Sequence, residues 1–474
     1  MKNRMRRINC VHFIGIGGSG MSGIAEVMLS LGYDVQGSDL KVNSAIKRLK
    51  SLGVKVFIGH SSSNIINTDA VVLSSAIEDI NEEVQAARIQ GLPIVSRAEM
   101  LAELMRFRFS IAVSGTHGKT TTTSLIAHIL AEAQLDPTFV IGGCLKNTNE
   151  NARLGQSEYL VAEADESDAS FIQLKPMLSV VTNIDADHMD TYSGDLQILR
   201  NTFLQFLHNL PFYGLAILCG DDPGIRLILD EIGRSVITYG ISDKVDVKAK
   251  NIVFDGEQVS FDVARPNHKD LLHIRTNLSG EHNVQNILAA ICVASELGVS
   301  DKYLKAALLN FEGIERRFQN LGTIETQNGS LLFIDDYGHH PTEIRETIKA
   351  ARSSWPDKRI ILIFQPHRYS RTRDLIDDFA AELSKVDVLI LLEVYDAGEE
   401  FIAGADGRSL ARAVRSRGSL EPVFLESLED LPVTLDQLTN DGDLVLTMGA
   451  GDIGGWGKKL VNKLPVKETL VANK

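Results

Sequence analysis

One segment of the chain combines residue types that bind nucleotide phosphates. In AVSGTHGKTTTT (112–123), an apolar run leads into Gly118, Lys119 and Thr120, after which a helical pattern begins. In such a loop, backbone N–H groups and the lysine hold the β- and γ-phosphates, and the hydroxyl after the lysine ligates Mg²⁺. The general pattern G-x-x-x-x-G-K-[ST] would need a glycine in place of Val113. Because a lysine at the start of a helix has no packing role, we still predict a phosphate-binding loop.

A second glycine-rich segment, GIGGSG (15–20), lies near the N-terminus. It fits G-x-G-x-x-G between an apolar strand pattern and a helical one, which lets a diphosphate approach the backbone at a helix N-terminus. Asp39 follows the next strand pattern, where a ribose-binding acid is expected. A turn that only packs helix on strand would also need glycines, and GAGDIG (449–454) has the same spacing. The segment predicts a nucleotide site but does not distinguish NAD from another nucleotide.

Polar residues that suit metal binding follow two further strand patterns. Glu163 lies in VAEADESDAS (161–170), and His188 lies in VVTNIDADHMD (180–190). Ligands bind at the carboxyl ends of parallel strands, so these side chains could hold Mg²⁺ beside a γ-phosphate. A solvated acidic loop is the alternative interpretation.

Histidines and arginines gather at two strand ends in the last third of the chain. The segments are DDYGHHPTEI (335–344) and FQPHRYSRTRD (364–374). Arg368 and Arg371 are three residues apart, so both guanidinium groups could reach one carboxylate or phosphate. A surface cluster of salt bridges is the alternative, but the strand-end position favours anion binding.

Short β-branched apolar runs alternate with helical patterns along most of the chain, which predicts an α/β fold with mostly parallel sheets. Strands are predicted at 10–16, 34–38, 54–59, 69–75, 93–96, 158–165, 178–185, 215–220, 331–337, 359–365, 387–395 and 443–449, with a β-rich patch at 236–275. Helices are predicted at 19–32 and 281–298.

The chain has 474 residues, a length that corresponds to about three domains. We predict a Rossmann-like domain at 1–106, a central P-loop ATPase-like domain at 107–313 and a Rossmann-like C-terminal domain at 314–474. The net charge of −14 makes the chain a poor nucleic-acid binder. We expect a cytoplasmic, soluble protein without membrane insertion, with four reduced and mostly buried cysteines: Cys10, Cys144, Cys219 and Cys292.

Together these segments resemble the Mur ligase family. The matching stretches, in chain order, are FIGIGGSGMSGIA, SGTHGKTTTT, EADESDASF, TNIDADHMDTY, GEHNVQNILAA, GIERRFQ, DDYGHHPTE, QPHRYSRT and GAGDI. The phosphate loop then matches the shorter form of this family, G-T-x-G-K-T. DDYGHHPTE and QPHRYSRT point to the alanine-adding branch of the family.

The resemblance implies an ATP- and Mg²⁺-dependent ligase of peptidoglycan precursor synthesis. It would join L-alanine to the lactyl carboxylate of UDP-N-acetylmuramate through an acyl phosphate, releasing ADP and phosphate. A related ligase that adds a preformed peptide to the same UDP sugar stays open, as does an NAD-dependent oxidoreductase or a nucleotide-gated binding protein. The sequence does not indicate an oligomeric state.

The resemblance also assigns residues to sites. UDP-sugar binding falls to Gly15, Gly17, Gly18, Ser19, Gly20, Asp39 and Ser75. ATP binding falls to Gly115, Thr116, His117, Gly118, Lys119, Thr120, Thr121, His282, Asn283, Asn286 and Arg317. The metal falls to Thr120, Glu163 and His188, and catalysis to Lys119, His339, Arg368 and Arg371. Several family members carry a carbamylated lysine fifteen residues after the metal-site histidine; this chain has Phe203 there, so no carbamate ligand is expected.

Overall fold

The computed structural model describes residues 5, 7–74, 76–143, 146, 150–326 and 328–463. They form two compact units. The first runs up to Ile252 and includes Phe261–Arg275 and Gln285–Glu312; the second comprises Val253–Ser260, Thr276–Val284 and the chain from Gly313 onward.

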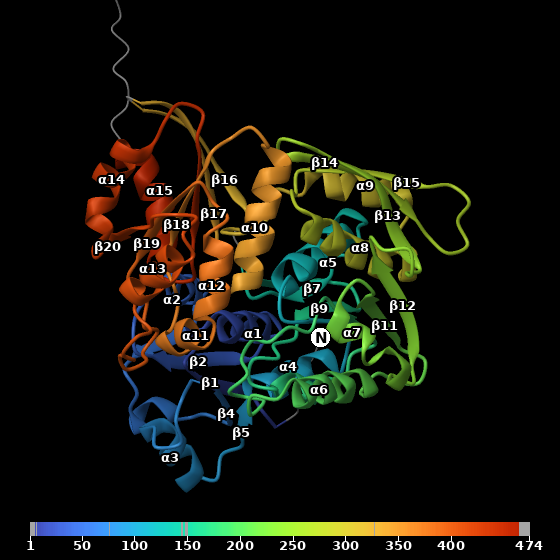
Figure 1. Cartoon of the computed structure of the whole chain (residues 1–474). Helices are drawn as coiled ribbons and strands as arrows, with labels where there is room; N and C mark the ends of the chain where they lie inside the picture. Colours follow the sequence, from blue (N-terminus) through green and yellow to red (C-terminus); the bar gives the residue numbers. More distant parts are fainter. Residues whose placement is uncertain are drawn as a thin grey trace, which may run out of the picture. The chain divides into compact units, whose positions relative to one another are not determined.

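The first unit begins with a parallel five-stranded sheet in the order β3-β2-β1-β4-β5 (Figure 1). The order reverses between β1 and β4, and ligands of such sheets bind at that point, beyond the carboxyl ends of the strands. The elements are β1 (Cys10–Ile14), α1 (Ser19–Ser30), β2 (Asp34–Asp39), α2 (Ser44–Ser51), β3 (Lys55–Ile58), β4 (Ala70–Leu73), α3 (Glu82–Ile89), β5 (Ile94–Ser96) and α4 (Arg97–Met105).

The central sheet has ten strands in the order β15-β14-β13-β12-β11-β10-β6-β9-β7-β8. β6 lies between β10 and β9 and is parallel to both, so three strand ends that carry predicted site residues lie side by side. Its strands are β6 (Phe109–Ser114), β7 (Thr138–Val140), β8 (Ala152–Arg153), β9 (Tyr159–Glu163), β10 (Leu178–Val181), β11 (Leu215–Cys219), β12 (Ser235–Gly240), β13 (Val247–Asp255), β14 (Gln258–Ala264) and β15 (Leu272–Thr276). Its helices are α5 (Lys119–Glu132), α6 (Leu196–His208), α7 (Pro223–Arg226), α8 (Glu281–Glu296) and α9 (Asp301–Asn310).

The second unit contains a six-stranded sheet in the order β16-β17-β21-β18-β19-β20, in which only the β16–β17 pair is antiparallel. Its strands are β16 (Gln319–Thr326), β17 (Gly329–Asp336), β18 (Ile360–Phe364), β19 (Val388–Leu392), β20 (Val423–Leu425) and β21 (Leu444–Met448). Its helices are α10 (Pro341–Ser354), α11 (Tyr369–Asp374), α12 (Ile376–Leu383), α13 (Gly407–Ser416), α14 (Leu431–Leu438) and α15 (Ile453–Lys463).

Alternate residues of the third sheet enter two different hydrophobic clusters. Leu362 and Phe364 of β18 pack in one cluster, and Ile361 and Ile363 pack in the other. Both faces of the sheet are therefore buried, as expected when helices cover both sides of parallel strands. This explains why β18 reads as a continuous apolar run in the sequence.

The α/β architecture with mostly parallel sheets is confirmed. Each predicted strand is present, but several end before their predicted limits because the last residues belong to the loops that carry polar groups. β7, β8, β16 and β20 were not predicted individually. The domain boundaries at 106 and 313 stay predictions.

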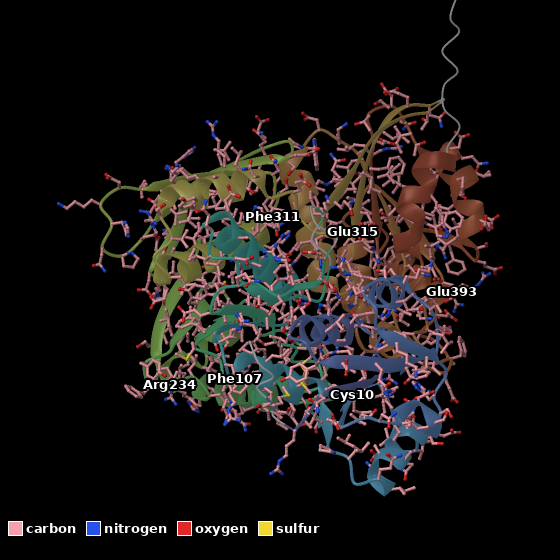
Figure 2. The ribbon with its side chains drawn as sticks, turned by 180° about the vertical axis from the view of Figure 1, so that it is seen from behind. Cys10, Phe107, Arg234, Phe311, Glu315 and Glu393 are labelled. Carbon is pink, nitrogen blue, oxygen red and sulfur yellow. The ribbon has the colours of Figure 1, made fainter. Side chains whose placement is uncertain are left out.

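The cysteines in the described part of the chain are free thiols. Cys10, labelled in Figure 2, begins β1 and is partly exposed, whereas Cys219 and Cys292 are buried. Burial raises the pKa of Cys219 to about 12, which keeps this thiol protonated and unreactive. Cys144 lies outside the described residues. Among the described helices, none has the length and apolar character needed to cross a bilayer.

Candidate functional site

The first glycine loop leaves β1 where the strand order reverses. Gly15 has a φ of +79° and its N–H donates to the carbonyl of Ser38 at 2.8 Å. At Gly17, the N–H donates to Asp39 Oδ2 at 2.9 Å, and the carbonyl accepts from Asn43 Nδ2 at 2.9 Å. Asp39, predicted to bind a ribose, therefore holds the loop itself in this structure.

The remaining residues predicted for the UDP sugar lie around the same turn. The N–H of Gly18 donates to the carbonyl of Gly15 at 3.2 Å, and α1 begins at Ser19. A Cβ atom placed on Gly20 would lie 2.7 Å from Arg97 Nη1, so a side chain at this position would have to displace that guanidinium group. Ser75 lies outside the described residues.

A buried polar cluster supports this loop through Ser38. The carboxylate of Glu83 on α3 accepts hydrogen bonds from the Ser38 hydroxyl at 2.5 Å and from Asn64 Nδ2 at 2.6 Å. His12 Nε2 lies 3.3 Å from the same carboxylate, and His60 Nδ1 lies 3.4 Å from it. Because the backbone carbonyl of Ser38 accepts from Gly15, the cluster fixes the residue that shapes the glycine turn.

The phosphate loop at 115–119 connects β6 to α5 through two glycines. Gly115 has a φ of +129°, and a Cβ there would lie 2.1 Å from Thr182 Oγ1. Gly118 has a φ of +80°, and a Cβ there would lie 2.6 Å from Asn286 Oδ1. The backbone conformation and the close neighbours both require glycine at these positions.

Replacing Gly115 with alanine should weaken ATP binding while leaving the fold intact. The added methyl group would meet Thr182 in a backbone region that strains an L-residue, which forces the loop to move. We expect ATP affinity, measured by calorimetry, to fall by at least about ten-fold, equivalent to roughly 1.4 kcal/mol. Gly455→Ala is the matched control, because nothing lies within 4 Å of a Cβ at that helical position. Unchanged ATP affinity in Gly115→Ala would contradict the assignment of this loop.

Lys119 begins α5 and is held inside the loop. Its Nζ donates to the carbonyls of Gly115 at 2.7 Å and Thr116 at 3.1 Å, and to Glu166 Oε1 at 2.8 Å. Burial opposes the charge of Lys119, but the carboxylates of Glu166, Asp165 and Glu163 raise its pKa above the ordinary value. Burial raises the pKa of Glu166 to about 7, although Lys119 opposes that rise. The lysine is thus a permanent cation at the place where phosphate oxygens would lie.

Thr120 and Glu163 form an all-oxygen pair at the carboxyl ends of β6 and β9. Thr120 Oγ1 lies 3.1 and 3.0 Å from the two carboxylate oxygens of Glu163. The N–H of Gly142 donates to Glu163 Oε2 at 2.8 Å and orients the carboxylate. A hydroxyl and a carboxylate beside a phosphate loop are hard oxygen donors that suit Mg²⁺, so these residues fit the predicted metal.

Thr120→Val should raise the Mg²⁺ concentration needed for half-maximal activity by about ten-fold, because the variant keeps the shape of the side chain but loses its oxygen ligand. Thr120→Ser keeps the hydroxyl and is the matched control. The measurement is initial rate against Mg²⁺ concentration at saturating ATP. An unchanged Mg²⁺ requirement in Thr120→Val would remove Thr120 from the metal site.

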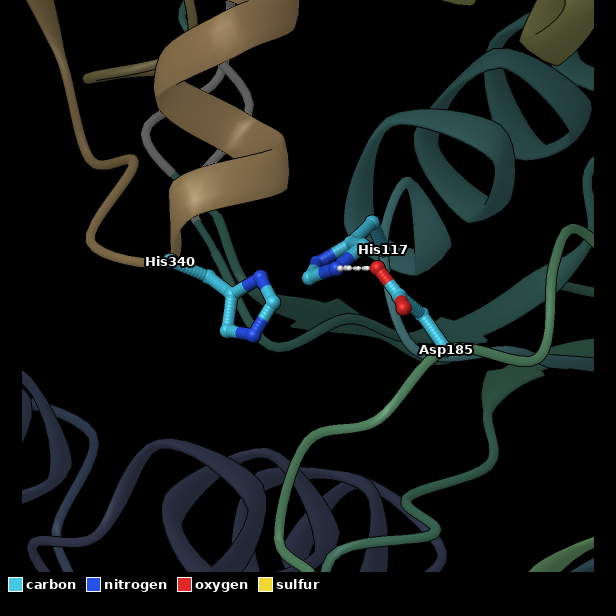
Figure 3. A group of neighbouring side chains, drawn as sticks. All are labelled: His117, Asp185 and His340. Carbon is cyan, nitrogen blue, oxygen red and sulfur yellow. Dashed lines mark ion pairs between the residues drawn. The ribbon is translucent and has the colours of Figure 1, made fainter. Parts of the chain in front are cut away.

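Residues after β10 fix the other side of the phosphate loop. Asn183 accepts from the N–H of His117 at 2.8 Å and donates to the carbonyl of His117 at 3.0 Å. The N–H of Asp185 donates to Thr116 Oγ1 at 2.9 Å. Figure 3 shows the ion pair between His117 and Asp185, whose Nε2 and Oδ2 atoms are 3.4 Å apart. The ring of His117 is therefore held by an acid from the next strand end.

His188 and Phe203 follow on the same side of the sheet. His188 has a φ of +54° and its Nε2 lies 3.6 Å from Asp187 Oδ2. Its role as a metal ligand stays a prediction. Phe203 on α6 is fully buried and packs edge-on against Phe171, with 5.1 Å between ring centroids. This packing places an apolar ring where a carbamylated lysine occurs in other family members.

The residues predicted to contact adenine lie on α8. Asn286 Oδ1 accepts from the hydroxyl of Thr122 at 3.1 Å, which ties α8 to the first turn of α5. Asn283 Nδ2 donates to the carbonyl of Ser279 at 2.7 Å. Burial lowers the pKa of His282, so its ring is neutral near pH 7. Thr121, a further residue predicted to bind ATP, lies on α5 and is buried.

The second unit has its own cluster of predicted catalytic residues. His367, after β18, stacks on Tyr395 with 5.5 Å between ring centroids, and His339 meets His367 edge-on at 5.6 Å. Arg371 Nη1 lies 3.5 Å from His367 Nδ1. Burial, followed by the charges of His339, Arg371 and Arg368, lowers the pKa of His367 to about 4. His367 is therefore a neutral ring that packs between the charged groups.

Arg317 and His339 both approach one acid on α10. Arg317 Nη1 lies 3.5 Å from Glu343 Oε1, and its guanidinium carbon lies 5.1 Å from the ring centroid of Tyr337. His339 Nδ1 lies 3.5 Å from Glu343 Oε2. Arg368 is the N-cap of α11 with a φ of +71°, and its N–H donates to the carbonyl of Tyr395 at 2.8 Å. These interactions bring the predicted residues of the second unit to one end of its sheet.

Three residues of these clusters were missed in the sequence: Arg97, Glu343 and Tyr395. Arg97 directly follows a predicted strand and Tyr395 is the last residue of another, and strand ends already signalled the other site residues. Glu343 is the third residue of α10 and forms a capping box with His340. Its position in the sequence therefore indicates only a role at the start of a helix.

A parallel sheet carries a phosphate loop at the end of β6, and an acid from β9 contacts the threonine of that loop. These features define an α/β nucleotide-binding protein. Three consecutive parts of the chain also match family models. Residues 10–109 match the model described as Mur ligase family, catalytic domain; residues 113–294 match the Mur ligase middle domain; and residues 316–451 match the Mur ligase, glutamate ligase domain.

Solved structures agree with this match. The UDP-N-acetylmuramate-alanine ligase MurC from Thermotoga maritima is 29% identical, with a TM-score of 0.80 over 96% of this chain and 98% of that one. A murein peptide ligase from Psychrobacter arcticus is 27% identical, with a TM-score of 0.68 over 96% and 98%. The UDP-N-acetylmuramate:L-alanyl-gamma-D-glutamyl-meso-diaminopimelate ligase from Neisseria meningitides is 30% identical, with a TM-score of 0.60 over 65% and 100%.

The chain belongs to the Mur ligase family, the ATP-dependent ligases of peptidoglycan synthesis. This membership removes the NAD-dependent oxidoreductase as an interpretation of the first glycine loop.

Proposed function

We propose that this enzyme joins L-alanine to the lactyl carboxylate of UDP-N-acetylmuramate, with conversion of ATP to ADP and phosphate, and that it acts in the cytoplasm. The observation that carries the proposal is the similarity to the UDP-N-acetylmuramate-alanine ligase from Thermotoga maritima, which extends over 96% of this chain. The histidine and arginine cluster around His339 and His367 gives the second unit charged groups suited to an amino acid.

The first step would activate the carboxylate. An oxygen of the lactyl carboxylate attacks the γ-phosphorus of ATP, the bond to the β-phosphate oxygen breaks, and ADP leaves. This step gathers negative charge from the carboxylate and the phosphates, and Lys119 lies in the loop that would hold them. Positioning and charge neutralisation dominate phosphoryl transfer, so a fixed lysine and the N–H groups of the loop are the expected contributions of the chain.

Thr120 and Glu163, with His188 as a further predicted ligand, would hold Mg²⁺. When bound, Mg²⁺ would neutralise phosphate charge. The oxygen pair at the end of β6 and β9 is preformed, since Gly142 already fixes Glu163.

In the second step, the unprotonated amine of L-alanine attacks the acyl carbon, phosphate leaves, and the amide forms. The amine must lose protons to react. We assign His339 as the group that accepts one, because its ring is held next to Glu343, whose carboxylate stabilises the protonated form. Arg368 and Arg371 would bind the carboxylate that reacts.

The proposal is tested by measuring products with each substrate left out in turn. ADP and phosphate should appear only when ATP, UDP-N-acetylmuramate and L-alanine are all present, and the new product should be the alanyl amide by mass spectrometry. Release of AMP and pyrophosphate would contradict the acyl-phosphate route.

A ligase that adds a preformed peptide is the second candidate, because two of the similar structures are named as peptide ligases. Comparing L-alanine, glycine, L-serine and the tripeptide L-alanyl-γ-D-glutamyl-meso-diaminopimelate as acceptors separates the two. A higher kcat/KM for the tripeptide than for L-alanine would replace the proposed function with peptide addition.

A further inference from the structure

Arg97 lies between the first glycine loop and the acidic segment after β9, and nothing in the proposed function uses it. It is the first residue of α4, directly after β5. A capping box fixes this helix start: Ser96 Oγ accepts from the N–H of Glu99 at 3.1 Å, and Glu99 Oε2 accepts from the N–H of Ser96 at 2.6 Å. The backbone of Arg97 is therefore held in place at the carboxyl end of the strand.

One edge of the guanidinium group is bound by acids from the central sheet. Arg97 Nη2 lies 3.0 Å from Asp165 Oδ2 and 3.9 Å from Asp168 Oδ2, in the segment after β9. These contacts from the segment after β9 can orient the guanidinium group of Arg97.

The other edge faces the first glycine loop. Arg97 Nη1 lies 2.7 Å from the position that a Cβ on Gly20 would occupy, against the first turn of α1. A diphosphate bound by this loop would lie at the same helix N-terminus. Arginine presents its N–H donors in a planar fork, so Nη2 can bind Asp165 while Nη1 points toward the loop.

A cavity lies on the same side of the loop. It has a volume of about 230 Å³ and is lined by Ser74, Ile77, Ser96, Arg97, Asp168 and Ser170, among others. Ser74 also borders Gly15, since a Cβ on that glycine would lie 3.1 Å from Ser74 Cβ. Arg97 thus lines a cavity together with Ser74, a residue that borders the first glycine loop.

We propose that Arg97 binds the diphosphate of the UDP sugar, with Asp165 as the residue that positions it. The inference rests on the proposed function, because the first loop must bind a UDP sugar. It adds a cation close to Asp39, whose negative charge opposes a diphosphate.

Calorimetry without ATP tests the proposal, with uridine, UDP, UDP-N-acetylglucosamine and UDP-N-acetylmuramate as probes. Arg97→Ala should weaken binding of the three diphosphates by about ten- to a hundred-fold and leave uridine unaffected. Arg97→Lys should lose less affinity, because lysine keeps the positive charge but lacks the planar set of N–H donors. Asp165→Asn should also weaken binding of the diphosphates. The double variant should lose less binding free energy than the sum of the two single losses.

Arg88→Ala is the matched control. Arg88 also pairs with an acid, with Nη2 2.6 Å from Asp79 Oδ1, but on the exposed side of α3; its removal should change no affinity. If Arg97→Ala does not fold, Arg97→Lys and Asp165→Asn carry the test, and wild-type affinity for UDP in both would overturn the proposal.

Other results also overturn the inference. Equal affinity of wild type and Arg97→Ala for UDP excludes the diphosphate contact. A loss confined to UDP-N-acetylmuramate assigns Arg97 to the lactyl carboxylate instead, and an equal loss for uridine shows a general disruption. Failure of the wild-type chain to bind any UDP compound would contradict the proposed function itself.

Discussion

Lys119→Ala should reduce ADP formation by about a hundred-fold or more, which corresponds to roughly 3 kcal/mol of transition-state stabilisation. The variant removes the ammonium group that lies against the loop carbonyls of Gly115 and Thr116. The first glycine loop is built from other residues. Binding of UDP-N-acetylmuramate should therefore stay within a few-fold of wild type.

The buried carboxyl of Glu166 affects the stability of the Lys119→Ala variant, and a substitution of Glu166 provides the control. Without Lys119, the buried carboxyl of Glu166 loses its cation, so its pKa rises further above about 7 and the group takes up a proton. Lys119→Ala should then lose stability as the pH rises above 7, where keeping that proton costs free energy. The double variant Lys119→Ala/Glu166→Gln has no ionisable group at position 166, so it should not show this loss of stability at high pH and should still be inactive.

Three measurements separate these effects: ADP release, UDP-sugar affinity by calorimetry, and melting temperature at pH 6 and pH 8.5. Equal losses of activity and UDP-sugar affinity in Lys119→Ala would mean that the two loops were assigned to the wrong ligands. Recovery of activity in the double variant would show that Lys119 acts only by compensating Glu166.

Glu83→Ala should have the largest effect on stability, about 3 to 5 kcal/mol, because it removes the acceptor at the centre of a buried cluster. The donors on Ser38 and Asn64 would lose their partner inside the protein. Since the carbonyl of Ser38 holds Gly15, the first glycine loop should loosen as well. UDP-sugar affinity should therefore fall in this variant even though Glu83 is remote from any ligand.

The same cluster predicts how stability changes with pH. Burial would raise the pKa of Glu83, but hydrogen bonds from His12, Ser38 and Asn64 lower it to about 2 from an ordinary value of 4.5. A lowered carboxyl pKa stabilises the folded state above pH 4.5, and this contribution of about 3 kcal/mol is lost as the pH falls toward 2. Glu83→Gln should remove that part of the pH dependence.

Urea denaturation between pH 3 and pH 7 measures both effects, with fluorescence and circular dichroism as independent probes. Glu82→Ala is the matched control: it lies next to Glu83 on α3 but is exposed, so its midpoint should not move. A Glu83→Ala midpoint within experimental error of the control would show that the cluster contributes no net stability.

Much of the architecture could be read from the sequence because parallel strands buried on both faces appear as continuous apolar runs. β6, β10 and β18 are of this kind, and their ends located the loops that follow. β16 was missed because it is antiparallel and lies at the edge of its sheet, with only Ile324 and Thr326 buried along its length. β8 has two residues, too few for any periodic signal.

Individual site residues could be predicted where a short segment of the chain carries the signal. Contacts that the fold makes between distant segments could not be predicted. Thr120 and Glu163 were each placed by strand-end position, and the structure brings their side chains into contact. The Glu83 cluster joins residues from four separate segments, and each looks ordinary in its own segment. Asp39 was predicted to bind the UDP sugar, and that role stays a prediction. Its hydrogen bond to the Gly17 N–H could not be foreseen, because a sequence shows which acid follows a strand but not which N–H group lies nearest.

Phe203 has a further consequence for the solution conditions of the enzyme. A lysine becomes a carbamate by reaction with dissolved carbon dioxide, so ligases that depend on one need that gas in the buffer. The side chain of Phe203 has no nitrogen to react. Its ring packs against Phe171, which also packs against Phe206, and all three side chains are buried. The turnover rate of this ligase should be the same in degassed and bicarbonate-supplemented buffer.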